Sequence, residues 1–174
     1  FLMFLFFDNI WWAIIAPIVF IALNYASYKM NLIKSMERSG KGNLGTVYFP
    51  ISLLILVILS FTVTTPLVGG LGILVLGYGD GLAAVIGKKF GKKKLINNKS
   101  LEGSLTMFFA SLVVSLLLLS IFSPVAISIQ VILLFSLVIA SIGTVIELVT
   151  PKGLDNLSIP LLSSLVLFIL LKII

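Results

Sequence analysis

Long apolar stretches alternate with short polar stretches along the whole chain. A helix needs about 20 mainly apolar residues to cross a bilayer, because each residue adds about 1.5 Å to its length. The opening residues FLMFLFF are too short to cross alone and look like the end of an earlier span. The pattern predicts an all-α, polytopic integral membrane bundle of about seven spans, the first partial, in a single domain over 1–174. We place the six complete spans at roughly 10–27, 46–65, 67–87, 102–122, 125–147 and 159–174.

The connectors between these spans alternate in charge. Three of them, near 8–9, 65–66 and 123–124, are short and hold no Lys or Arg. The other three hold eleven of the twelve basic residues, and five of the six acidic residues lie in or near them. Lys and Arg accumulate in the cytoplasmic loops of membrane proteins. We therefore predict that these charged groups share the cytoplasmic side.

Composition narrows the chemistry that the chain can perform. Hydrophobic residues make up 60% and charged residues 10%, with a mean hydropathy of +1.26, far from the composition of soluble domains. Cysteine and histidine are both absent, which excludes thiolate and imidazole chemistry from these residues. The net charge of +6 is divided among short patches between apolar stretches, so we expect phosphates or anionic headgroups as partners and no nucleic acid.

The first candidate site is the sequence GYGDG, in which Asp80 interrupts an apolar span. A carboxylate at the centre of a spanning helix costs about 2.5–3.5 kcal/mol, and such acids usually mark function. Gly77, Gly79 and Gly81 each weaken the helix by about 1 kcal/mol relative to Ala. Close helix packing would explain one or two of them, whereas all three beside an acid indicate backbone opened to a ligand. Lys88 lies eight residues after Asp80, on the same helix face. The structural alternative is an Asp80 that is only paired with a lysine or hydrogen-bonded.

The second candidate site is NKSLEGS, which reads as the start of a helix. We predict Ser100 as the N-cap, with Glu102 in the first turn, where an acid stabilises the helix dipole. The free N–H groups of a helix start also bind phosphate, here beside Lys99 and Ser100, and Gly103 would allow a close approach. For Glu102, a purely structural role stays open.

The third candidate site is ELVTPKGLDNLSIP. Glu147 lies in the last turn of an apolar helix, where an acid is disfavoured, so a lysine or a metal ion should compensate it. Asp155 and Asn156 follow in a turn, and we predict Ser158 as the N-cap of the next helix. Both residues of the turn could serve the turn alone or contact a metal ion or nucleotide.

The three blocks GYGDGLAAVIGKKFGK, NKSLEGSLTMF and ELVTPKGLDNLSIP resemble, in this order and spacing, the CTP-dependent polyprenol kinase family. This family includes dolichol, phytol and farnesol kinases and a diacylglycerol kinase branch. RSGKGNLGTVYFP also resembles the loop after an early span of that family, so that the resemblance covers about 40–160. It implies a transmembrane catalytic domain that transfers the terminal phosphate of CTP to a membrane-embedded lipid alcohol, either isoprenoid (dolichol, phytol, farnesol or geranylgeraniol) or diacylglycerol.

The residue types agree with this chemistry. Carboxylates without His or Cys favour Mg²⁺, and Mg²⁺ with lysines around a triphosphate is the usual equipment of phosphoryl transfer. By block, we predict catalytic roles for Asp80, Lys99 and Glu102, phosphate or nucleotide binding by Gly79, Gly81, Lys88, Lys89, Ser100, Gly103 and Asn156, and metal binding by Asp80, Glu147 and Asp155. The prediction requires these distant residues to gather at one site that faces the cytosol.

Two alternatives remain from the residues alone. A cytidylyltransferase would use the same ingredients to form a CDP-lipid, although the DRxD ending of the phosphatidate enzymes is missing. A transporter could also use a glycine-broken helix with a buried acid. The absence of a repeat in the sequence and the one-sided charge count against transport.

Overall fold

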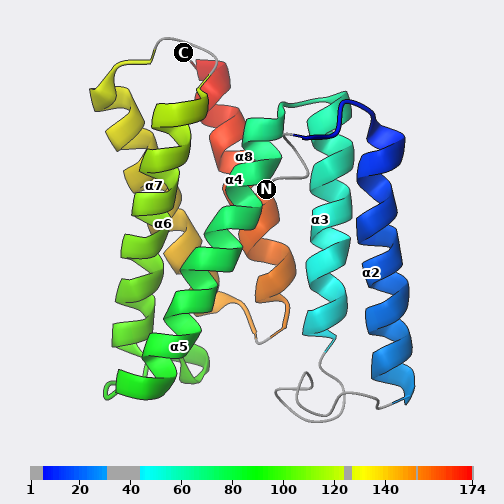
Figure 1. The fold of residues 1–174 in the computed structure, drawn as a ribbon. Helices are drawn as coiled ribbons and strands as arrows, with labels where there is room; N and C mark the ends of the chain where they lie inside the picture. Colours follow the sequence, from blue (N-terminus) through cyan, green and yellow to red (C-terminus); the bar gives the residue numbers. More distant parts are fainter. Residues whose placement is uncertain (1–5, 31–43, 124–126, 152, 174) are drawn as a thin grey trace.

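The computed structural model describes residues 6–30, 44–123, 127–151 and 153–173, which are mostly helical (Figure 1). Within them, one isolated β-bridge joins Lys94 to Ser100. In chain order the elements are α2 (Ile10–Met30), α3 (Gly45–Thr62), α4 (Pro66–Leu74), the π-helical turn η1 (Val75–Asp80), α5 (Gly81–Phe90), the 3-10 turn η2 (Ile96–Asn98), α6 (Leu101–Phe122), α7 (Ile129–Val149) and α8 (Asp155–Ile173).

Six helices in the described residues are long and apolar enough to cross a membrane. They coincide with the six complete spans predicted above, with ends displaced by about one turn at most. The third span is the continuous helix Pro66–Phe90, made of α4, η1 and α5. The all-α prediction is confirmed for these residues. The partial first span falls largely on 1–5, outside the described residues, so a seventh span stays a prediction.

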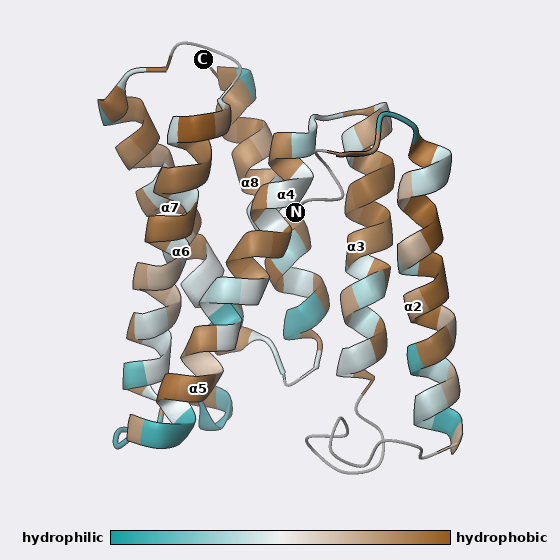
Figure 2. Ribbon diagram, in the orientation of Figure 1, coloured by the Kyte–Doolittle hydropathy of each residue, from teal (hydrophilic) through white to brown (hydrophobic). Residues whose placement is uncertain are grey.

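The helices pack into one group, with α2 at its edge. α6 and α8 pack against the α4–η1–α5 helix, and α7 packs on α6 and α8. α3 packs on α4 and α8, and α2 packs mainly on α3 (Figure 1). Apolar residues fill the middle of the helices and polar ones their ends (Figure 2). Because lipid is as apolar as these side chains, close packing holds such helices together. The fully buried side chains at the centre include Leu71, Val75, Met107, Ile139 and Leu167.

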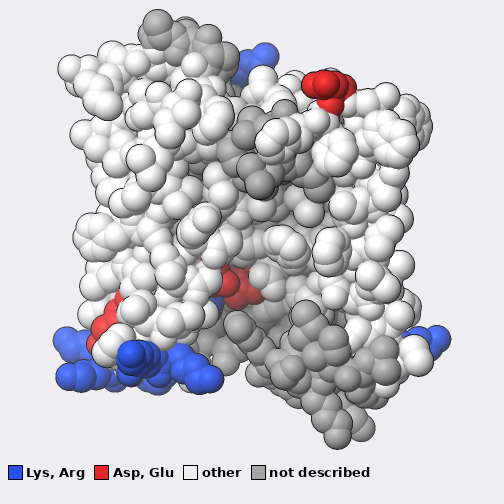
Figure 3. All heavy atoms as spheres, viewed as in Figure 1, with Lys and Arg blue, Asp and Glu red and all other residues white. Residues whose placement is uncertain are grey.

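Charge is distributed unevenly between the two ends of the helices. Most positive side chains visible in Figure 3 gather at the lower end, where α2 and α5 end. Lys172, in the last turn of α8, lies at the opposite end. The described residues therefore have the one-sided charge that the connectors predicted.

The start of α8 corrects one prediction. The helix begins at Asp155, so Ser158 is not its N-cap; its hydroxyl donates instead to the Leu154 carbonyl at 3.1 Å. Pro160 has no N–H to give to the Asn156 carbonyl one turn earlier. The Ser52 hydroxyl of α3, which also bonds to the Phe49 carbonyl of its own helix at 2.8 Å, lies 3.0 Å from the Asn156 carbonyl, so a neighbouring helix supplies a donor for it.

Gly72 lies where α4 crosses α8. A Cβ atom at this position would collide with the Pro160 carbonyl and the Ser164 hydroxyl. That hydroxyl donates to the Val68 carbonyl at 2.9 Å, which also ties the two helices together. Small residues allow such close approach of helix backbones in membranes.

We expect Gly72→Ala to lower the unfolding free energy of the purified protein by about 1–3 kcal/mol, because overpacking forces the two backbones apart. Gly81→Ala is the matched control, since a Cβ at Gly81 meets nothing within 4 Å and Ala favours the helix by up to about 1 kcal/mol. Thermal unfolding in detergent measures both. Equal stability of the two variants would contradict this packing.

Candidate active site

Four segments that are distant in sequence meet at the side-chain nitrogen of Lys99. Its Nζ lies 2.6 Å from Glu147 Oε1, 3.4 Å from Asp155 Oδ2 and 3.7 Å from Asp80 Oδ1. The acids come from the end of η1, the last turns of α7 and the start of α8, and Lys99 comes from the connector before α6. The structure thus brings together the four residues whose gathering the sequence analysis required. We call them the Lys99 cluster.

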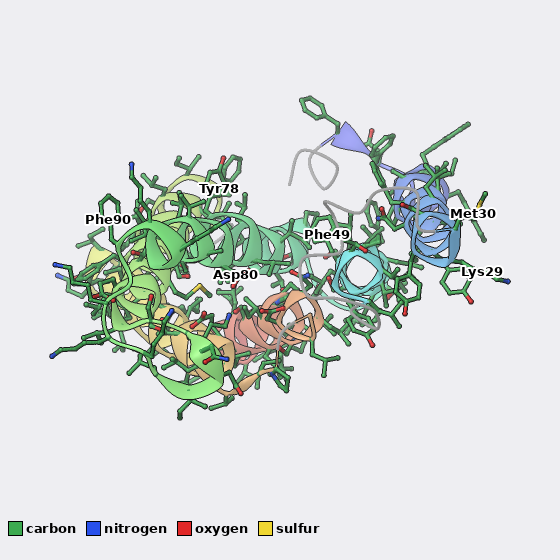
Figure 4. The ribbon with its side chains drawn as sticks, turned by 90° about the horizontal axis from the view of Figure 1, so that it is seen from below. Lys29, Met30, Phe49, Tyr78, Asp80 and Phe90 are labelled. Atoms are coloured by element: carbon green, nitrogen blue, oxygen red, sulfur yellow. The ribbon has the colours of Figure 1, made fainter. Side chains whose placement is uncertain are left out.

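The members of the Lys99 cluster differ in depth. The exposed fraction of the side chain is 3% for Glu147, 12% for Asp155, 16% for Lys99 and 21% for Asp80. Seen from below, Asp80 lies between the α4–η1–α5 helix and α8 (Figure 4). Acidic atoms are also visible in a hollow of the surface above the basic end (Figure 3). Glu147 therefore forms the floor of the cluster, and Asp80 is its most accessible group.

Lys99 stays charged despite its burial. Burial lowers the pKa of an amine, but the hydrogen bond to Glu147 and the nearby carboxylates of Asp80, Glu147 and Asp155 outweigh it. The pKa of Lys99 is therefore raised above its ordinary 10.5, and the ammonium persists at neutral pH. The positive partner that Glu147 was predicted to need is this lysine.

The connector between α5 and α6 is folded so that it points Lys99 inward. Asn97 and Asn98 have φ angles of 55° and 59°, a left-handed conformation that Asn tolerates better than most residues. Asn97 Nδ2 donates to the carbonyls of Leu148 and Val149 at 3.0 and 3.2 Å, which fastens the connector to the end of α7. Asn97 was not among the predicted site residues, although adjacent asparagines are a turn signal.

Hydrogen bonds also fix the carboxylates of the cluster. Asp155 Oδ1 accepts the N–H groups of Gly153 and Asn156, both at 3.0 Å, which leaves Oδ2 for Lys99. Ser104 donates to Glu147 Oε2 at 3.3 Å. Ser104 was not among the predicted site residues either; its only signal in the sequence is a position one turn after Ser100 on α6.

The start of α6 confirms the predicted N-cap. Ser100 Oγ accepts the N–H of Gly103 at 3.1 Å. α5 and α6 also approach each other closely in this region: a Cβ on Gly103 would lie 3.0 Å from the Ala83 carbonyl, and one on Gly87 2.8 Å from Ser100 Oγ. Packing therefore accounts for Gly103, and its phosphate-binding role stays a prediction.

Several predicted site residues lie outside the Lys99 cluster. Glu102 Oε2 accepts the backbone N–H of Lys92 at 3.1 Å and so holds the basic connector. Lys88 and Lys89 are exposed at the end of α5, and the Lys89 ammonium lies 5.2 Å from the centre of the Phe90 ring. Lys88 forms no ion pair with the acidic residues that the structure describes, although it was predicted on the face of Asp80.

The remaining predicted residues have different surroundings. Gly79 packs against α6, where a Cβ would lie 2.6 Å from Ser111 Oγ, whereas Gly81 borders open space. Asn156 Nδ2 donates to the Gly45 carbonyl at 2.9 Å and so ties α8 to α3. The first part of the RSGKGNLGTVYFP motif, up to residue 43, lies outside the described residues.

Mg²⁺ binding by the cluster stays a prediction. Among the described residues, no three acidic side chains form a complete metal site by themselves. Mg²⁺ is usually held by one or two carboxylates together with substrate phosphates and water. In their ionised forms the three carboxylates outnumber the single ammonium, so the site can accept a divalent cation that arrives with phosphates. Asp80 and Asp155, which are more exposed than Glu147, are the residues suited to hold it.

Fold and site together define an all-α protein with six candidate membrane spans and a charged centre sunk between them. Phytol kinase from Synechocystis sp. is 33% identical over 159 residues, which cover 90% of this chain and 67% of that protein. A probable chloroplastic phytol kinase from Triticum aestivum is 36% identical over 149 residues, and phytol kinase 1 from Arabidopsis thaliana is 28% identical over 148. The chain therefore belongs to the phytol kinase family, and the family predicted from the three blocks is confirmed.

The chain spans two thirds of the Synechocystis relative and about half of the plant relatives, 49% of the Triticum protein and 48% of the Arabidopsis protein. No family model matches the chain. No solved structure matches it either.

We expect Lys99→Met to lower the unfolding free energy by about 3–5 kcal/mol, because it leaves buried carboxylates without their counter-charge. Lys94→Met is the matched control; this lysine is exposed, and its loss should change stability by less than about 0.5 kcal/mol. Chemical denaturation in detergent measures both. If the two variants unfold alike, Lys99 does not hold the carboxylates together.

Proposed function

We propose that this chain forms the catalytic part of an integral membrane kinase that transfers the γ-phosphate of CTP to an isoprenoid alcohol such as phytol. The observation that carries the proposal is the Lys99 cluster, in which one ammonium and three carboxylates meet in a partly open site between apolar helices. Such groups position phosphates, neutralise their charge and accept a proton. Membership of the phytol kinase family supports the choice of acceptor.

In the proposed reaction, the alcohol oxygen attacks the γ-phosphorus of CTP and forms a new P–O bond. The bond from this phosphorus to the bridging oxygen breaks, and CDP leaves with the electron pair. Asp80, the most accessible carboxylate of the cluster, accepts the proton of the alcohol. Lys99 stabilises the negative charge on the transferred phosphoryl group.

Asp155 would hold Mg²⁺, which would neutralise phosphate charge beside Lys99; in the alternative assignment Asp80 is its second ligand and not the base. Glu147 keeps Lys99 in place from below, through the 2.6 Å ion pair. Lys88 and Lys89, at the exposed end of α5, attract the phosphates of CTP as it approaches. Glu102 holds the basic connector that these phosphates pass.

We also propose that the site opens to the cytoplasmic side. Lys99 lies in the connector between α5 and α6, at the end of the helices where positive side chains gather (Figure 3). Positive loops favour the cytoplasm, where CTP is available as a soluble substrate. An alcohol in the bilayer reaches the same site laterally, because Asp80 belongs to the spanning helix Pro66–Phe90.

We expect purified protein with γ-labelled CTP, Mg²⁺ and phytol to form labelled phytyl phosphate and to release CDP. Asp80→Asn should reduce the rate by about 10²–10⁴-fold, the usual contribution of a general base. Asp8→Asn, the same change at an exposed residue outside the spans, should leave the rate unchanged. Thin-layer chromatography of lipid and nucleotide products measures both.

The product also separates the kinase from the alternatives. Release of pyrophosphate with a CDP-lipid would identify a cytidylyltransferase, and substrate flux into liposomes without nucleotide consumption would identify a transporter. A wild-type protein that labels no isoprenoid alcohol and no diacylglycerol would overturn the proposal.

Removal of divalent cations with EDTA should abolish the transfer, and added Mg²⁺ should restore it, because the phosphates need a counter-ion that the lysines alone do not supply. The initial rate of CDP release, titrated against free Mg²⁺, measures this dependence. Undiminished transfer in EDTA would rule out the metal.

A further inference from the structure

An apolar groove lies beside the spanning helix that carries Asp80. Its volume is about 640 Å³, within the usual range of small-molecule sites, about 300–1,000 Å³. It runs between the α4–η1–α5 helix and α6. Its lining includes Leu74, Tyr78 and Leu82 on one side and Val113, Leu117 and Ile121 on the other. Every side chain that lines it is apolar or aromatic.

The groove begins near the depth of Asp80 and extends away from the basic end. Gly79 packs against Met107 and Ser111, so Asp80 lies close to the level of Phe109 on α6. From there α6 continues through Leu117, about 12 Å further along its axis, to Phe122 at the opposite end. A molecule with its polar end near Asp80 and a long apolar chain would therefore lie along the groove.

Asp80 and the groove lie on different faces of the same helix, and a strip without side chains joins them. Tyr78 lines the groove, whereas Asp80, two residues later, points to Lys99. Gly77 and Gly81 are both exposed, and a Cβ on either would meet nothing within 4 Å. The helix surface between groove and carboxylate is therefore open to a chain that crosses it.

From this arrangement we infer that the groove holds the hydrocarbon tail of the lipid alcohol and that its length sets the preferred chain length. The inference rests on the proposed kinase function. The hydroxyl lies at Asp80, the first part of the chain crosses the Gly77–Gly81 strip, and the rest follows α6 into the apolar middle of the helices. The groove begins near the depth of Asp80, below the membrane surface. A bilayer lipid keeps its headgroup at the surface, whereas the substrate would place its hydroxyl at Asp80, so the substrate tail is the occupant that fits this depth.

Leu117→Trp tests the inference by obstructing the far half of the groove. Relative to wild type, we expect the ratio of kcat/KM for phytol to kcat/KM for the shorter geraniol to fall about tenfold or more. Each methylene removed from an apolar site weakens binding by roughly fourfold. Leu134→Trp is the matched control: Leu134 is 57% exposed and Leu117 58%, but Leu134 lies on α7, outside the groove.

A binding measurement complements the kinetics and needs no catalysis. A phytol analogue with a diazirine at the end of its chain should label α6 between Leu117 and Phe122, and excess phytol should compete. Labelling elsewhere, or labelling that phytol does not reduce, overturns the inference. This experiment uses the wild-type protein, so it still tests the inference in the case that Leu117→Trp does not fold.

The outcomes separate the inference from the proposed function. If wild type phosphorylates isoprenoid alcohols and Leu117→Trp keeps the phytol-to-geraniol ratio of Leu134→Trp, the groove is not the tail site and the kinase stands. If wild type phosphorylates no alcohol, the proposed function fails, and the groove inference falls with it.

Discussion

The ammonium of Lys99 is the contact on which the rest of the site depends. Charges buried away from water are tolerated only when they are paired and hydrogen-bonded. Lys99 provides that pairing for carboxylates from the end of η1, from α7 and from the start of α8. The connector between α5 and α6 thereby links three helices through Lys99. Asn97 bonds this connector to the end of α7, and Ser104 bonds to Glu147, the partner of Lys99.

The spanning helix Pro66–Phe90 separates two environments that a lipid-alcohol kinase needs. One face turns Asp80 toward the charged cluster, and another lines an apolar groove along α6. The π-helical turn η1 lies where they meet, and such turns occur frequently at functional sites. Gly77 and Gly81 leave the surface between the two faces open. The charged Lys99 cluster and the apolar groove thus lie within a few residues of each other on this helix but remain separate sites.

Much of this arrangement was predictable from the sequence because the physical constraints were local. The thickness of the membrane set the length of the apolar stretches and so predicted the six long helices. The position of Glu147 near a helix end predicted a positive partner, which is Lys99. Contacts between distant segments were not predictable. At the start of α8, the Asn156 carbonyl accepts from Ser52 of α3, and beside Lys99 the Asn97 side chain bonds to the end of α7. Glycines predicted to serve phosphates proved ambiguous, because packing against α6 explains Gly79, and the packing of α6 against α5 explains Gly103, equally well.

The most direct test of the account is a solid-state NMR distance measurement in lipid bilayers. Protein labelled with ¹⁵N at lysine Nζ and ¹³C at the side-chain carboxyls of Asp and Glu should show one strongly dephased lysine signal, which Lys99→Arg removes. The account predicts this signal because Nζ lies 2.6 Å from Glu147 Oε1, with two further carboxylates nearby. A spectrum in which no lysine nitrogen is dephased by a carboxyl carbon would contradict it.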